Sequence, residues 1–219
     1  MENAQQSPRL ADLVTILYRP RETMRRILDG RHRWSIAVVV LAFACASFTD
    51  IDTRELGDVL PGMKLLPTLA LVTFSIIIGA LLWVIALFII TWIATPIGRL
   101  LGGEGSMADV RAALGWGMVP IVWSVIYRIP VAIYVSRLQV MPKPNVRHVL
   151  LDFLSRGGCS VVVAFLVLQA AFALWCIVIG SFTLGEAQRF STQKGFVNLA
   201  IALALPLLVF FAAVFTFRR

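Results

Sequence analysis

Five long apolar runs constrain the fold of this chain more than any other feature of its sequence. The longest covers about residues 65–95 and exceeds the roughly 20 residues that an α-helix needs to cross a bilayer. Of the 219 residues, 59% are hydrophobic and only 15% are charged, whereas soluble domains carry about 25% charged residues. We therefore predict an all-α, polytopic membrane helix bundle with five transmembrane helices, at about 34–49, 65–95, 112–135, 159–182 and 195–217.

The first 33 residues precede this transmembrane domain, which we assign to 34–219, and they form a cytoplasmic amphipathic segment. Apolar residues recur at helical spacing from Leu10 to Leu28, and Pro20 starts a second short helix at its first turn. Two placements of these interfacial helices remain open. They lie at the level of the lipid headgroups with their apolar side toward the membrane, or they pack on the cytoplasmic ends of the bundle.

A glycine-rich connection follows the longest run. Gly102, Gly103 and Gly105 permit a tight turn, because glycine adopts positive φ without steric cost. Ser106 and Asp109 have the spacing of a capping box, which predicts a helix that begins near Met107. The same helix contains proline at positions 120 and 130, where we expect bends.

Charged residues in this connection share a predicted face with those of the 185–195 connection. Three acids can then meet three arginines there. The set comprises Glu104, Asp109, Arg111, Glu186 and Arg189, together with Arg99. One interpretation is a group of solvated loop charges. The sharper one is a polar cluster, with Gly102, Gly103 and Gly105, that locks the bundle or receives a partner.

Two polar residues fall inside the predicted spans. A charge such as Arg128 is costly in a membrane unless it faces the interior, pairs or extends to an interface. Its late position in the third helix favours extension to the non-cytoplasmic interface, and pairing with Asp152 is the alternative. Gln169 could donate or accept a hydrogen bond across the bundle, typically for about 1 kcal/mol. A short amphipathic helix is expected around residues 149–154.

No catalytic, metal-binding or cofactor-binding pattern is present. Three cysteines, an odd number, sit in or beside apolar runs and are read as buried hydrophobes: Cys45, Cys159 and Cys176. The two histidines lie far apart and lack cysteines at ligand spacing. The glycine-rich turn lacks the Lys-Ser/Thr pair of a phosphate-binding loop. We therefore predict a protein that is not an enzyme and uses no metal or cofactor.

The placement of basic residues predicts the orientation. Segments 1–33, 96–111 and 184–195 hold eleven Lys and Arg, against eight on the opposite connections and the C-terminus. Because cytoplasmic loops carry the excess of Lys and Arg, the N-terminus is expected in the cytoplasm and the C-terminus outside. The net charge of +8 comes with no aromatic-basic platform, so we do not expect nucleic acid as a partner.

Several of these segments together resemble the Yip1 domain family, in its bacterial form. The segments are YRPRETMRRI at 18–27, GGEGS at 102–106 before a helix that reaches Pro120, and Trp175 followed by GEAQRFS at 185–191. The resemblance covers about residues 10–217 and implies a five-helix membrane domain with a cytoplasmic N-terminus. Eukaryotic relatives bind Rab-type GTPases and act in vesicle trafficking. We expect this chain in a bacterial inner membrane.

Two functions are compatible with the sequence. The first is a non-enzymatic scaffold or interaction protein that organises the membrane through its cytoplasmic loops. Its partners would be the lipid bilayer, a membrane or cytoplasmic protein, or further copies of itself. The alternative is a small transporter or channel for an ion, solute or lipid, since broken helices and intramembrane polar groups often line pathways.

Overall fold

The computed structural model describes residues 10–30, 34–47, 65–138 and 158–217. Every regular element in these ranges is a helix. In chain order they are α1 (Asp12–Thr15), α2 (Pro20–Asp29), α3 (Ser35–Ser47), α5 (Leu65–Leu100), α6 (Met107–Gly117), α7 (Val119–Trp123), α8 (Val125–Leu138), α10 (Gly158–Ala187) and α11 (Thr192–Phe217). The predicted helix near 149–154 and the acid Asp152 lie outside the described residues.

Four stretches are long and apolar enough to cross a bilayer, which confirms a polytopic helical membrane protein. They are Thr73–Leu100, Met107–Val131, Val163–Ala187 and Thr192–Thr216. The fifth apolar helix, α3, is shorter, with 13 residues. Large apolar side chains such as Leu81 and Leu82 are more than half exposed on α5, as expected of a surface covered by lipid.

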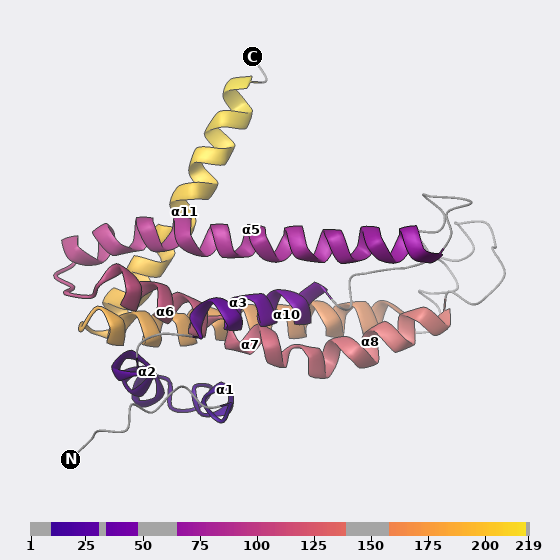
Figure 1. The fold of residues 1–219 in the computed structure, drawn as a ribbon, viewed down its shortest axis with the longest axis horizontal. Coiled ribbons are helices and arrows are strands. Elements are labelled where there is room, and N and C mark those ends of the chain that lie inside the picture. Colours follow the sequence, from indigo (N-terminus) through magenta and orange to yellow (C-terminus); the bar gives the residue numbers. More distant parts are fainter. Residues whose placement is uncertain (1–9, 31–33, 48–64, 139–157, 218–219) are drawn as a thin grey trace.

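The stretch Met107–Val131, formed by α6, α7 and part of α8, is the most enclosed of the four. Within it 56% of the most apolar window is buried, against 11–12% in the other three candidate spans. Small residues allow this enclosure: a Cβ on Gly117 would lie 3.0 Å from Gly180 Cα of α10, and one on Gly115 would lie 2.8 Å from Ser35 O of α3. Figure 1 shows α5 and α10 running in roughly the same direction, while the C-terminal part of α11 leaves the bundle at a steep angle.

The helix bounds differ from expectation at two prolines. We expected a helix end near Pro96, but α5 continues through it to Leu100. One missing backbone donor does not end the helix, and the Leu101 N–H still bonds Ile97 O at 3.1 Å. Near Pro120 the helix is interrupted twice, at Met118 and at Ser124, on either side of α7. Pro130 does not interrupt the helix and lies inside α8.

The N-terminal helices pack on protein. Ile16, Met24 and Ile27 are at most 1% exposed, so this side of the segment packs on protein, whereas Leu10 and Val14 are 75% and 43% exposed. The Trp123 indole N–H donates to Leu13 O at 3.0 Å and ties α1 to the end of α7. The second of the two placements left open by the sequence, packing on the ends of the bundle helices, is therefore the one observed.

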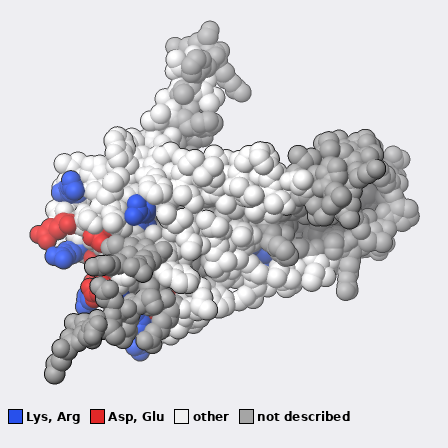
Figure 2. Space-filling view, in the orientation of Figure 1, with Lys and Arg blue, Asp and Glu red and all other residues white. Residues whose placement is uncertain are grey.

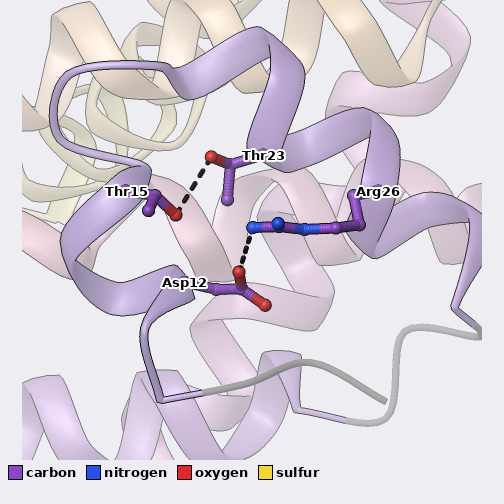
Figure 3. A network of polar contacts seen from close by, with 4 residues as sticks. All are labelled: Asp12, Thr15, Thr23 and Arg26. Atoms are coloured by element: carbon purple, nitrogen blue, oxygen red, sulfur yellow. Dashed lines mark hydrogen bonds and ion pairs between the residues drawn. The ribbon is translucent and has the colours of Figure 1, made fainter. Parts of the chain in front are cut away.

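A polar network joins α1 to α2 (Figure 3). Arg26 donates to the carboxylate of Asp12, whose side chain is 4% exposed. The Thr23 hydroxyl donates to the Thr15 hydroxyl at 3.2 Å. Removing one partner of a buried ion pair is destabilising, so the contact helps to hold the two helices relative to each other.

Candidate functional site

The glycine-rich turn ends α5 through two backbone hydrogen bonds of the Schellman type. The Gly103 N–H bonds Gly98 O at 2.8 Å, and the Gly102 N–H bonds Arg99 O at 3.0 Å. Gly102 has φ +88°, a conformation that favours glycine. The capping box then starts α6: the Asp109 N–H donates to Ser106 Oγ at 3.2 Å, and the Ser106 N–H donates to Asp109 Oδ2 at 3.0 Å. The predicted helix start at Met107 is confirmed.

The turn between α10 and α11 repeats this backbone pattern. The Arg189 N–H bonds Glu186 O at 3.2 Å, and the Phe190 N–H bonds Gly185 O at 3.0 Å. Arg189 has φ 58°, so an arginine occupies the left-handed position that glycine holds in the first turn. A non-glycine residue in this region costs of order 1 kcal/mol, which the surrounding contacts must offset.

These two turns, 102–105 and 188–191, lock together. The Glu104 N–H donates to Gln188 O at 3.1 Å. The Lys194 ammonium donates to Leu101 O at 2.8 Å. A Cβ on Gly105 would lie 2.4 Å from Ala187 O, and one on Gly103 would lie 2.2 Å from Gln188 Oε1. The glycines are therefore required for the close approach as well as for the turn.

Only some of the charged side chains predicted to cluster at the two turns are in contact with one another. Glu104 and Arg189 form an ion pair at 3.7 Å, with 75% and 77% of their side chains exposed. Asp109 is used in the capping box. Arg111 does not join the acids, because its guanidinium lies over the Phe88 ring, 5.1 Å from the centroid.

Glu186 binds a residue that the sequence did not indicate. The Arg25 Nε of α2 donates to its Oε1 at 2.8 Å, and the Glu186 side chain is 16% exposed. The hydrogen bond to Glu186, and then its charge, raise the pKa of Arg25. The contact fastens α2 to the end of α10.

Gln188 is a second residue that sequence reasoning missed. Its side chain is fully buried between the two turns and α5, and its Nε2 donates to Ala94 O at 3.4 Å. A single glutamine at the end of an apolar helix has no periodic pattern that would indicate this position. The nearest signal is the pair of glycines, Gly98 and Gly103, whose missing side chains make room for it.

The two intramembrane polar residues lie together. Arg128 is 7% exposed and donates to Gln169 Oε1 at 3.0 Å and to Ala46 O at 2.9 Å. The Tyr127 hydroxyl also donates to Gln169 Oε1. The expected extension of Arg128 to the interface is wrong: its side chain is buried in the bundle, where Ala46 O of α3 and Gln169 Oε1 of α10 accept hydrogen bonds from two of its nitrogens.

The comparison with known families decides the identity. The family model for the Yip1 domain matches residues 14–214. The chain belongs to the Yip1 domain family. No curated protein sequence and no solved structure gives a significant match. The family is one of membrane proteins and is not known as enzymatic, and this Yip1 domain is an integral membrane protein.

Among the described residues of this Yip1 domain, charge gathers at one end of the bundle (Figure 2). We call this the charged end and define it by the 102–105 turn, the 188–191 turn and helix α2. On the face shown, acidic and basic side chains cluster there, and the middle of the bundle is almost entirely uncharged. Among the described residues, no three His, Cys, Asp or Glu side chains are close enough together to hold a metal ion.

Proposed function

We propose that this Yip1 domain is a non-enzymatic membrane scaffold or interaction protein that receives a protein partner on its charged end. The charged end faces the cytoplasm of a bacterial cell in this proposal, and the C-terminus lies outside. The orientation rests on the excess of Lys and Arg in the segments that form this end, above all the seven arginines of residues 1–33.

One observation carries the proposal: an exposed ion pair stands on a backbone that is fixed from both sides. Glu104 and Arg189 are about three-quarters exposed, yet the turns beneath them are joined by the Glu104 N–H to Gln188 O bond. Exposed ion pairs contribute only about 0–1 kcal/mol to folding. Little folding stability is therefore lost when these two side chains turn from each other toward a partner. The fixed backbone beneath them lowers the entropy cost of binding.

Site-specific crosslinking in cells tests this proposal. A photo-crosslinking residue replaces Glu104 on one turn or Arg189 on the other, and a matched control replaces Trp92, which is 71% exposed on the lipid-facing part of α5. We expect one adduct of the same mass from both turns and none of that mass from Trp92. Different adducts from the two turns, or the same adduct from all three positions, would contradict the proposal.

A transporter or channel is the alternative, and one observation favours it. The α6 to α8 stretch is broken at Met118 and Ser124, and it carries the buried contact between Arg128 and Gln169. Broken helices and buried polar groups recur in transport pathways. Purified protein in sealed liposomes distinguishes the two functions: flux of an ion or solute that Gln169→Leu abolishes would favour transport and contradict the scaffold.

A further inference from the structure

A groove lies between the α1–α2 connection and the lipid-facing side of α10. Its volume is about 480 Å³. One wall is the segment from Leu17 to Glu22, which contributes Arg19 and Arg21. The other wall is apolar and belongs to α10, with Trp175, Val178, Ile179 and Phe182. None of the contacts described above fills this space.

We propose that this groove binds one anionic phospholipid, with its phosphate at Arg19 and Arg21 and an acyl chain along α10. This site is separate from the partner-binding turns and does not depend on the scaffold role. The assignment rests on charge complementarity at the rim and on the depth of the apolar wall.

The Arg21 side chain is held at the rim of the groove by contacts with uncharged groups. Its Nη2 donates to the neutral hydroxyl Thr192 Oγ1 at 2.7 Å, and its guanidinium lies 5.9 Å from the centroid of the Phe182 ring. Both contacts orient the side chain without supplying a negative charge. Arg19 has an acidic neighbour, Glu22, at 3.6 Å, but both side chains are mostly exposed, so solvent weakens that pair. Arg21 therefore offers a phosphate group a positive charge that its own contacts do not neutralise.

The apolar wall lies at the depth of acyl chains. Phe182 and Trp175 precede the end of α10 at Ala187 by five and twelve residues, or roughly 8 and 18 Å at 1.5 Å per residue. Val178 is 49% exposed and Trp175 is 38% exposed, so an occupant has apolar surface to cover. A peptide at this depth would bring backbone polar groups that need partners, whereas an acyl chain brings none.

Native mass spectrometry of the intact protein tests the site. The protein in detergent is titrated with phosphatidylglycerol or with phosphatidylcholine of identical acyl chains. We expect tighter retention of phosphatidylglycerol. Arg19→Gln/Arg21→Gln should weaken it roughly 25-fold, because each arginine near an anionic headgroup contributes about 1 kcal/mol, or about fivefold in affinity. The matched control, Arg99→Gln/Arg189→Gln, removes the same charge from exposed positions outside the groove and should change retention less than twofold.

A second pair of variants tests the apolar wall without a change in charge. Val178→Trp fills the groove and should weaken phosphatidylglycerol retention severalfold. Val167→Trp places the same side chain at a 61% exposed position elsewhere on α10 and should not. Equal retention of the two lipids by the unmodified protein would overturn the proposal. So would equal effects of the two double variants, or of the two tryptophan variants.

Discussion

Gly105 shows how one absent side chain joins two distant parts of the chain. Its backbone is buried against α10, and a Cβ there would lie 2.4 Å from Ala187 O and 3.1 Å from Ala187 C. Both atoms belong to backbone that the turn between α10 and α11 holds in place. The clash cannot be relieved by a rotamer change, so the two turns would have to separate.

We predict that Gly105→Ala destabilises the bundle by roughly 1–3 kcal/mol, because overpacking against backbone forces the structure to shift. The measurement is the thermal unfolding midpoint of purified protein in detergent. Gly185→Ala, in the last turn of α10, is the matched control. Its Cβ would make ordinary contacts at 3.4 Å or more, and alanine is the better helix former. Equal midpoints for the two variants would contradict the proposed close approach.

Gln169 makes a second prediction at this scale. It accepts from both Arg128 and Tyr127, so Gln169→Leu takes an acceptor from one buried and one half-buried donor. We expect a loss of roughly 1–3 kcal/mol in the free energy of unfolding, the usual cost of an unsatisfied buried group. The unfolding midpoint again reports it. Leu174→Ala, at a position 63% exposed on the same helix, should change the midpoint little. A similar shift in both variants would argue against the buried contact.

Single residues were predictable from sequence where their partners are local. Ser106 and Asp109 are three positions apart, so the capping box could be recognised from spacing alone. The contact of Arg25 with Glu186 joins positions 161 apart in the chain, and no spacing rule reaches that far. Gln188 was missed for the same reason, since only the packed turns show that its side chain is enclosed.

Helix α2 is held by apolar burial, with the ion pair to Glu186 as an addition. Met24 is fully buried and Ile27 is 1% exposed against the bundle. Sequence could not distinguish this placement from one on the membrane surface, because both bury the same apolar side. Likewise, proline at position 96 looked like a helix end, but only the contacts of α5 with its neighbours show that the helix continues.

We predict that Met24→Ala releases α2 from the bundle. Large-to-small replacement of a fully buried side chain costs roughly 2–5 kcal/mol, which is more than a ten-residue helix can offset. Limited trypsin digestion measures the release, because cleavage after Arg25 or Arg26 requires α2 to open. Digestion there should be at least tenfold faster than in the unmodified protein. Leu10→Ala, at a position 75% exposed, is the control and should leave the rate unchanged.

At the scale of the whole bundle, the described residues place charge at one end and apolar surface along the middle (Figures 1 and 2). The charged end brings together the C-terminal ends of α5 and α10, the N-terminal ends of α6 and α11, and helix α2. This separation followed from sequence, since runs of apolar residues leave the charges only in the connections. The direction in which the charged end faces rests on the modest excess of Lys and Arg alone.

The central claim is that the charged end lies in the cytoplasm, where a partner can reach it. Its most direct test is labelling of intact cells with a membrane-impermeant thiol reagent, after Cys45, Cys159 and Cys176 have been replaced by alanine. Glu104→Cys should stay unlabelled until the cells are permeabilised, and Arg219→Cys should label at once. Labelling of Glu104→Cys in intact cells, with protection of Arg219→Cys, would contradict the claim.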